Sequence, residues 1–349
     1  VAALQKALAD KANRLILRRG EAIDVLPMLV EETGATAVYW QRAYDPASQA
    51  RDADVKASLS ATGLEAKSFK GHLLFEPWTV QTKLGGFYKV YTPLWKAVRG
   101  REVPEPLPAP ARIPGPETYP SSEALGAWGL GRAMQRGGAI VERYARVGAD
   151  LAQERLAEFT SGALRHYGEG RDIPGEDGTS KLAENLALGE ITPAQCWYAA
   201  QTEWERGNPG AEIFLKELVW REFAYHLLHH TPEILHQNWK PAWDSFPWSK
   251  DRNSSKFFAW KSGRTGLEFV DAAMRELYVT GTMHNRGRMI VASYLTKHLM
   301  THWRLGQAWF EQCLIDWDPA SNAMGWQWAA GSGPDATPYF RVFNPETQI

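Results

Sequence analysis

Apolar and polar positions in the first 80 residues follow two alternating spacings. Side chains at the spacing of an amphipathic helix predict three helices, over residues 1–13, 21–34 and 45–63. Short apolar runs predict three strands, over residues 14–20, 35–40 and 64–69. This alternation is typical of a parallel sheet with right-handed crossovers and helices on both faces. Because the series begins with a helix, we expect its first strand to be missing and the chain to be a fragment.

The pattern changes after the first hundred residues. The stretch REVPEPLPAPARIPGPETYP, residues 101–120, is rich in proline and predicts an extended linker. Beyond it strand patterns disappear, and helical spacing predicts helices over residues 138–164, 192–207, 212–230, 266–281 and 285–316. The predicted fold class is an α/β N-terminal domain (residues 1–98) with a parallel, Rossmann-like sheet that lacks its first strand, a proline-rich linker (99–138) and a large all-α domain (139–349).

Composition narrows the class of protein. The formal net charge of −1 excludes a uniformly basic surface, so a nucleic-acid partner would need a local basic patch. No apolar run reaches the length of a transmembrane helix, and we therefore expect no membrane partner. Cys196 and Cys313 both lie in predicted helices, which favours free thiols in a reducing cytoplasm over a disulfide framework.

Tryptophan is the unusual component, with 16 residues that lie mostly after position 195. The segment GWQWAAGSG holds Trp326 and Trp328 one residue apart. In a helix, positions i and i+2 lie about 200° apart, so one ring would face the interior and the other the outside. For an isolated pair, an accidentally half-exposed second ring is the simpler interpretation.

Two segments could bind a ligand. The glycine-rich loop at residues 167–182 carries Thr179 and Ser180 where a helix is predicted to begin, which suits a phosphate group. Taken alone, the segment is better explained as a capped surface loop, and the order of residues excludes a Walker A loop. The helix at residues 212–230 places Glu217 and Trp220 on one face, an acceptor beside a stacking platform for a flat heterocycle. Its alternative is an ordinary boundary helix.

Two further segments carry clustered polar residues. MHNRGRM, residues 283–289, offers an amide and two arginines at a helix start, which suit phosphates and base edges, although a solvated helix end has the same composition. LIDWDPASN, residues 314–322, favours an acceptor set for a bound ring. We predict no metal site, because neither these aspartates nor the histidine pairs have ligand spacing, and we expect those histidines at the surface or its boundary: His226/His230 and His298/His302.

Taken in order, these segments resemble the photolyase/cryptochrome family. The resemblance rests on GTSKLAENLALGEITPAQCW, ELVWREF, NWKPAWDSFPW, the run from GRTGLEF to TKHL, and LIDWDPASNAMGWQWAAGSGPDATPYFRVFNPETQ. It extends over nearly all of residues 160–347 and is strongest toward the bacterial photolyases that repair cyclobutane pyrimidine dimers. It implies a carbon–carbon lyase, bacterial, cytoplasmic and monomeric, whose partner is UV-damaged DNA.

The resemblance also implies FAD held in a U-shape within the helical domain. Residues matching the surroundings of the FAD phosphates and ribityl chain are Tyr167, Thr179, Ser180, Lys181, Leu182 and Arg221. Phe214 is also expected to bind the cofactor. Those matching the isoalloxazine and adenine surroundings are Asn285, Arg288, Asp316, Asp318 and Asn322. Arg288 and Asp316 would form an ion pair beside the ring, with Asn322 near flavin N5. A reduced, anionic flavin needs such donors and a cation.

A DNA-lesion pocket and an electron relay follow from the same resemblance. The lesion pocket would comprise Glu217, Trp220, Asn285, Met289 and Trp328, with Arg286 on a phosphate. The relay would run from Trp326 through Trp303 to Trp248 near the surface. The residues predicted to act in catalysis are Glu217, Asn322, Trp248, Trp303 and Trp326. Excited reduced FAD would pass an electron to the dimer and regain it after the ring splits.

One residue departs from the family pattern, and two other functions known in the family also fit parts of the sequence. Lys181 replaces the arginine usual in the family and loses its planar fork. A second, antenna chromophore of folate or deazaflavin type would lie between the two domains. A cryptochrome-type blue-light receptor fits the FAD site and relay equally well. A (6-4) photolyase fits less well, because Asn285 stands where those enzymes carry a second histidine.

Overall fold

The computed structural model describes residues 1–132, 134, 137–335 and 342–344. Its first part contains α1 (Ala2–Ala9), α2 (Ala22–Thr33), β1 (Ala37–Gln41), α3 (Pro46–Ala61), β2 (Glu65–Phe69), the 3-10 turn η1 (Pro77–Thr79) and α4 (Tyr91–Val98). Short helices α5 (Leu125–Trp128) and α6 (Gly138–Val141) follow. Among all the residues that the structure describes, no helix combines the length and apolarity needed to cross a bilayer.

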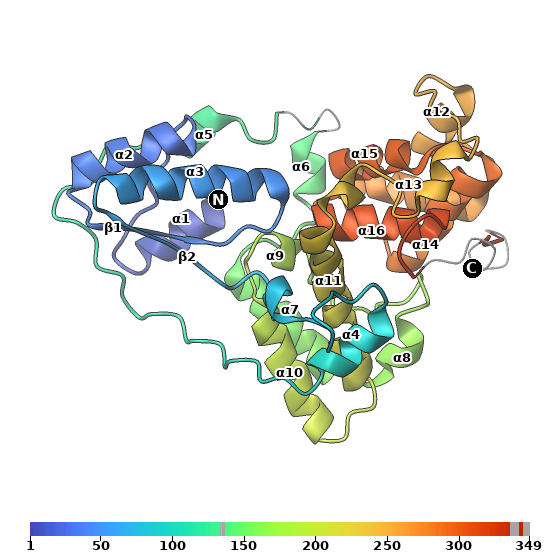
Figure 1. The fold of residues 1–349 in the computed structure, drawn as a ribbon, viewed down its shortest axis with the longest axis horizontal. Coiled ribbons are helices and arrows are strands. Elements are labelled where there is room, and N and C mark those ends of the chain that lie inside the picture. Colours follow the sequence, from blue (N-terminus) through green and yellow to red (C-terminus); the bar gives the residue numbers. More distant parts are fainter. Residues whose placement is uncertain (133, 135–136, 336–341, 345–349) are drawn as a thin grey trace.

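Among its described residues, the second part contains helices, loops and one isolated bridge, and no strand of a sheet. Its elements are α7 (Ala149–Ser161), η2 (Ala163–His166), α8 (Tyr167–Gly170), α9 (Ala183–Ala187), α10 (Pro193–Glu205), α11 (Ala211–His230), η3 (Pro232–Leu235), η4 (Pro241–Ser245), α12 (Ser255–Lys261), α13 (Glu268–Thr280), α14 (Asn285–Ser293), the π-turn η5 (Tyr294–His298), α15 (Trp303–Cys313) and α16 (Pro319–Ala330). Figure 1 shows β1, β2 and α3 at one end and α12–α16 at the other, with α11 between them.

The sheet has two parallel strands joined by α3, as the alternating pattern predicts for residues 35–69. The register runs from Ala37 opposite Glu65 to Gln41 opposite Phe69. Asp45 begins α3 by accepting a hydrogen bond from the Ser48 amide, with Pro46 at the first helical position. These local signals explain why this helix–strand alternation was readable from sequence.

The strand predicted at residues 14–20 is wrong. This segment is extended, but no strand lies beside it among the described residues, and its groups bond to the chain around residues 120–123 instead. The Leu17 amide donates to Ser122 Oγ at 2.9 Å, and the Leu17 carbonyl accepts from the Glu123 amide at 2.9 Å. The proline-rich stretch 101–120 has no helix or strand, as predicted, and its end is held against this segment.

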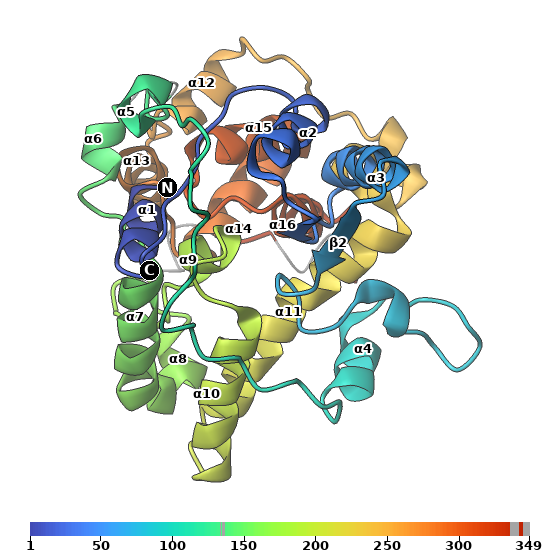
Figure 2. The ribbon, with the colours of Figure 1, turned by 90° about the vertical axis from the view of Figure 1, so that its left-hand side faces the viewer.

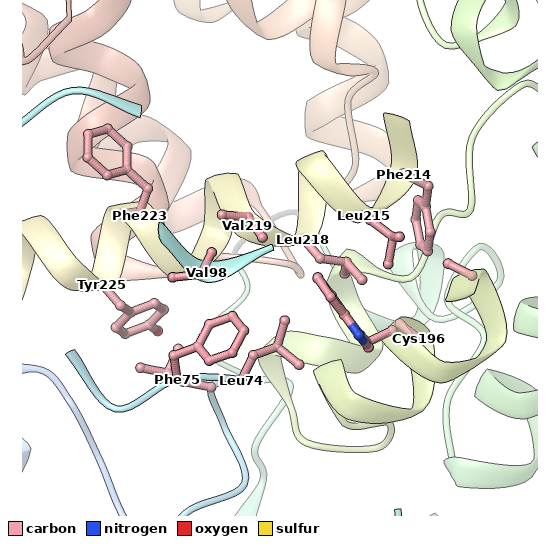
Figure 3. Close-up of a cluster of buried hydrophobic side chains, with 14 of the residues drawn as sticks. Leu74, Phe75, Val98, Cys196, Phe214, Leu215, Leu218, Val219, Phe223 and Tyr225 are labelled. Atoms are coloured by element: carbon pink, nitrogen blue, oxygen red, sulfur yellow. The ribbon is translucent and has the colours of Figure 1, made fainter. Parts of the chain in front are cut away.

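Helix α11 forms the axis of the larger core. Its apolar residues point in all directions around the helix, which is typical of a helix buried on every side. It packs against α10, α4 and α16, and Figure 2 shows α4 and α10 on one side of it and α16 on the other. Figure 3 shows Phe214, Leu218 and Phe223 along α11, with Leu74 and Phe75 from the N-terminal part packed nearby.

A second core lies among α12–α16 and is rich in tryptophan. The single helix predicted over residues 285–316 is wrong, since α14 ends at Ser293 and α15 begins at Trp303. Met300 between them adopts a φ of +51°, which no continuous helix allows. His302 then caps α15 by accepting from the Arg304 amide at 3.2 Å. Likewise Gly148, at φ +111°, separates α6 from α7 in the predicted helix 138–164.

His226 is buried, not at the surface or its boundary as the sequence predicted. Only 2% of the residue is exposed, and its Nε2 atom accepts a hydrogen bond from the Tyr88 amide at 3.0 Å. Burial, followed by the nearby charge of His230, lowers the pKa of His226 to about 4. The neutral ring therefore ties the segment before α4 to α11.

We predict that His226 makes the stability of the protein depend on pH. The folded state holds the neutral imidazole, whereas the unfolded chain protonates below its ordinary pKa of 6.5. The stabilisation is thus complete above about pH 6.5 and is lost as the pH falls toward 4, by on the order of 2–3 kcal/mol. Chemical denaturation at several pH values should show the wild type losing its advantage over His226→Gln across this interval.

The matched control is His166→Gln, which changes an exposed histidine in η2. The free energy of unfolding of this variant should change with pH as that of the wild type does. A wild-type advantage over His226→Gln that is constant with pH would contradict the assignment.

Candidate functional site

A cavity of about 680 Å³, here called the central cavity, lies between α11, α14, α15 and α16. This volume is within the range of about 300–1,000 Å³ that is usual for ligand sites. Most of the residues predicted for a ligand or DNA line it, namely Glu217, Trp220, Arg221, Asn285, Arg286, Arg288, Met289, Asp316, Asp318, Asn322, Trp326 and Trp328. Three separate sequence segments, residues 217–221, 285–289 and 316–328, therefore meet at one cavity.

An ion pair between Arg288 and Asp316 forms part of the cavity wall, as the sequence predicted. The Arg288 guanidinium contacts Asp316 Oδ2 at 2.6 Å and also donates to the Met283 carbonyl at 2.9 Å. The Asp316 side chain is only 6% exposed, and its Oδ1 atom is buried without a hydrogen-bond partner among the described residues. Because buried carboxylate oxygens are normally paired, this atom is an acceptor that awaits a donor.

Asp318 sits at the next turn and belongs to a buried polar network. Its Oδ1 atom accepts from the Ser321 amide at 2.6 Å and so caps α16. The hydroxyl of Tyr225 donates to its other oxygen and lies 2.9 Å from His72 Nε2. Arg221 donates to the His72 carbonyl at 2.6 Å, and burial together with this cation lowers the pKa of His72 to about 4.

Glu222 was not identified from sequence, although it anchors this network. The residue is 5% exposed and accepts hydrogen bonds from the Leu74 and Phe75 amides at 2.9 and 3.1 Å. Burial raises the pKa of its carboxyl to about 7. The sequence offers no distinct signal for it, because Glu222 is one of several charged residues in α11 and only the fold shows that it is buried and bound.

Four charged residues of alternating sign line the central cavity, and each contacts the next; we call them the mouth chain. In order of contact they are Glu217, Arg171, Asp172 and Arg286. Arg171, directly after α8, contacts Glu217 of α11. Its guanidinium also lies 4.0 Å from the carboxylate of Asp172. Asp172 in turn contacts Arg286 of α14 at 2.6 Å. Asp172 is the most exposed member, at 51%. Neither Arg171 nor Asp172 was singled out by the sequence, because their pairing partners lie far away along the chain.

The other predicted lesion-pocket residues border the same space. Trp220 stacks face to face on Tyr91 of α4, with ring centroids 3.7 Å apart, so one face of its indole is covered. Asn285 begins α14 and donates to Met289 Sδ at 3.8 Å. Asn322 on α16 donates to the Gln307 carbonyl at 3.2 Å.

Trp326 and Trp328 differ in exposure, as the helical spacing predicted. Trp326 is 2% exposed and packs edge-on against Phe310 at 4.9 Å, whereas Trp328 is partly exposed. The ring of Trp326 lies directly over Gly306, which shares a face of α15 with Trp303 because the two are three residues apart. Both indoles of the pair nevertheless border the central cavity.

Trp248, predicted to lie near the surface, is itself buried beneath a partly exposed ring. It is 6% exposed, and its indole N–H donates to the Thr296 carbonyl at 2.8 Å. The partly exposed ring of Trp243 stacks on it at 5.2 Å and 16°. His302 lies between Trp248 and Trp303, at 5.4 and 5.5 Å, and burial lowers its pKa to about 4.

The predicted phosphate-loop residues do not border the central cavity. Thr179 and Ser180 do not begin a helix as predicted, because α9 starts only at Ala183 and has five residues. Lys181, at a φ of +50°, turns its exposed side chain to Asp177 at 2.6 Å. Leu182 is buried, and Tyr167 and Phe214 pack in an aromatic cluster with Phe159. Their role toward a ligand stays a prediction.

A second cavity, of about 840 Å³, lies between the β1–α3 segment and α15. Cations line it from both sides, with Arg42 from the N-terminal part and Lys250, Arg252 and Arg304 from the helical part. Tyr225 and His72 also line this cavity, while their partners Asp318 and Arg221 line the central one. The Tyr225–Asp318 hydrogen bond therefore spans the wall between the two cavities.

Two sequence families match the chain. Residues 1–111 match the family described as DNA photolyase. Residues 214–349 match the family described as FAD binding domain of DNA photolyase.

Individual proteins are similar over nearly the whole chain. A deoxyribodipyrimidine photo-lyase of Agrobacterium fabrum is 46% identical over 350 residues, covering 100% of this chain and 73% of the relative. The crystal structure of a bacterial class III photolyase from Agrobacterium tumefaciens gives a TM-score of 0.94 at 45% identity, covering 99% of this chain and 72% of that one. A cryptochrome of Synechocystis gives 0.86 at 29% identity, covering 100% and 73%.

We predict that Gly306→Ala destabilises the protein by about 1–3 kcal/mol, the usual cost of overpacking a core. A Cβ at position 306 would lie 2.1 Å from Cη2 of Trp326, so the indole would have to move. Thermal unfolding followed by tryptophan fluorescence measures both the stability and the surroundings of that ring.

Gly325→Ala provides the control, since nothing lies within 4 Å of a Cβ built at this position of α16. It should stabilise the helix by up to about 1 kcal/mol, because alanine replaces glycine in a helix interior. Equal changes in the two variants would contradict the close packing of Trp326 on α15.

Proposed function

The chain belongs to the DNA photolyase family, and we infer that it is a light-driven enzyme that splits cyclobutane pyrimidine dimers in DNA, with the central cavity as its active site. FAD is its cofactor. Bound in its reduced form and excited by light, FAD would supply one electron for opening the cyclobutane ring and would recover it afterwards, so the net redox change would be zero. The protein supplies binding, orientation and electrostatics.

The observation that carries this proposal is the unpaired Oδ1 atom of Asp316 in the wall of the central cavity. A flavin ring offers N–H donors that suit this acceptor, and the adjoining Arg288 cation suits the negative charge of the reduced ring. Asn322, also in the wall, offers an amide. The donor set of the cavity thus fits the polar edge of a flavin.

On the flavin side, we assign Arg221, Asn285, Arg288, Asp316, Asp318 and Asn322 to FAD. Arg221 is already oriented by its bonds to His72. We also assign six residues outside the cavity to FAD, and this assignment rests on the family resemblance. They are Tyr167, Thr179, Ser180, Lys181, Leu182 and Phe214. Lys181 would have to leave Asp177 to reach a phosphate.

On the DNA side, a dimer flipped from the duplex would enter between Glu217 and Trp328. The Glu217 carboxylate would accept a hydrogen bond from thymine N3–H, and the indole rings of Trp220 and Trp328 would provide apolar contact. Since Tyr91 covers one face of Trp220, the dimer can contact only its free face or its edge. Asn285 and Met289 complete the pocket, and Arg286 would bind a phosphate.

For reduction of oxidised flavin, we propose that electrons move inward from Trp248 through Trp303 to Trp326. The stacked Trp243 and the ring of His302 adjoin this line and bring it to the solvent. This route serves photoreduction and is separate from dimer repair.

We further propose the second cavity as the place of an antenna chromophore. Its position between the N-terminal and helical parts, with four cations in its lining, suits the carboxylates or phosphates of a folate or deazaflavin. The proposed division is an α/β domain at residues 1–98, a linker at 99–138 and the FAD-binding domain at 139–349. The photolyase match, residues 1–111, extends a short way into this linker, and the FAD-binding match, residues 214–349, lies entirely beyond it.

A cryptochrome-type blue-light receptor is the second candidate, because a Synechocystis cryptochrome shares the fold at a TM-score of 0.86. The charged and aromatic set at the cavity mouth favours repair, since a receptor needs no acceptor for thymine there. A (6-4) photolyase is disfavoured by Asn285.

The direct test is repair itself. Protein with reduced FAD is incubated with an oligonucleotide containing one thymine dimer, in blue light and in darkness, and the remaining dimer is measured by chromatography. We expect loss of dimer only in the light. Equal dimer content in both samples would reject the proposal, and light-dependent repair of (6-4) product alone would reassign the substrate.

We predict that Trp328→Ala weakens binding to dimer-containing DNA by about 1–3 kcal/mol, the contribution of stacking on one base. Flavin content, measured by absorbance, should stay at the wild-type level. Trp204→Ala is the matched control, because this tryptophan of α10 is 51% exposed and lies outside both cavities. Loss of flavin without loss of DNA affinity would contradict the assigned role of Trp328.

A further inference from the structure

We propose that Asp172 is an internal substitute for a DNA phosphate, and that its displacement from Arg286 releases Glu217 to read the lesion. The inference rests on the proposed function and deepens it, because it couples grip on the DNA backbone to recognition of the damaged base. Asp172 is thereby a positioning residue that acts through its two arginine neighbours.

The geometry of the mouth chain supplies the first step. In the free protein both arginines are already occupied, Arg171 by Glu217 and Arg286 by Asp172. The two residues proposed to meet DNA, Glu217 and Arg286, are therefore each neutralised by a residue of the loop that follows α8. DNA cannot use either one without an exchange of partners.

The exchange can start at Asp172 because this carboxylate is half exposed. Its contact with Arg286 is open to solvent, and exposed ion pairs are weak and readily replaced. A backbone phosphate brings more negative charge and more acceptor oxygens to the same guanidinium, which can bind them in a bidentate manner. Phosphate therefore takes the place of Asp172 at Arg286.

The second step follows from the position of Arg171. Its guanidinium already lies 4.0 Å from Asp172 while it contacts Glu217. Once Asp172 loses Arg286, it is an unpaired anion beside this second cation. Arg171 then shifts toward Asp172 and leaves the Glu217 carboxylate free to accept the N–H of a pyrimidine in the cavity.

The exchange conserves the number of close ion pairs. Before docking, the close pairs are Glu217–Arg171 and Asp172–Arg286, with Arg171 and Asp172 4.0 Å apart; afterwards they are a tightened Asp172–Arg171 pair and phosphate–Arg286. Glu217 is then uncompensated unless a lesion donates to it. An intact duplex, which places no base in the cavity, leaves that carboxylate unsatisfied, so the exchange favours damaged DNA.

The test uses the full chain with bound FAD, in darkness, and measures affinity for one duplex with and without a thymine dimer at several salt concentrations. Asp172→Asn keeps the shape of the side chain but removes the charge that would attract Arg171. We expect tighter binding to intact duplex with a salt slope steeper by about 0.9. The preference for dimer-containing duplex should fall about tenfold, the size of one hydrogen bond to a charged group.

Two controls separate this from a general charge effect. Glu176→Gln makes the same charge change in the same exposed loop, and it should leave the preference for damaged DNA unchanged. Asp172→Glu retains the charge and should keep most of the preference. In a double-mutant cycle, Glu217→Gln should cost less preference in the Asp172→Asn background than in the wild type.

The outcomes distinguish a failure of the proposed function from a failure of the partner exchange. A wild type that binds damaged and intact duplex equally would reject the proposed function itself. A wild type with a clear preference that Asp172→Asn retains in full would overturn only the partner exchange. Equal losses in Asp172→Asn and Glu176→Gln, or strict additivity with Glu217→Gln, would overturn it as well.

Discussion

A buried carboxylate holds the two parts of this protein together. Glu222 lies inside α11, where its charge is costly, and it is stabilised by the amides of Leu74 and Phe75 from the N-terminal part. Its neighbour Arg221 binds the His72 carbonyl of the same segment. These bonds fix residues 72–75 against the central helix, and both cavities depend on that position because each is walled by this helix or by the segment bound to it.

The polar network that starts at this anchor also connects the two sites. His72, Tyr225 and Asp318 follow one another in hydrogen-bond contact from the second cavity to the central one. Since Asp318 also caps α16, which carries Asn322 and Trp326, the orientation of the flavin-side residues is tied to the N-terminal part. A single polar network therefore relates the proposed cofactor site to the proposed antenna site.

Much of the fold was readable from local signals, and each failure has an identifiable physical cause. The helix at residues 212–230 and the strands near 37–41 and 65–69 lie where the sequence predicted them. Residues 14–20 have the pattern of a strand, but a strand needs a neighbour to pair with, and that is not a property of the segment itself. The break between α14 and α15 was missed because apolar spacing continues across Met300. The cavity residues came from the order of motifs, whereas Glu222, Arg171, Asp172 and Trp243 depend on contacts distant in sequence.

The ring of His302, placed between Trp248 and Trp303, has a consequence for the proposed relay. Because burial, with the nearby charges of Lys250 and Arg304, keeps its pKa near 4, the imidazole carries no charge at neutral pH. In the proposed relay, a positive hole migrating outward between the two indoles would cross a polarisable but uncharged ring. Protonation of that ring would then play no part in charge separation at neutral pH.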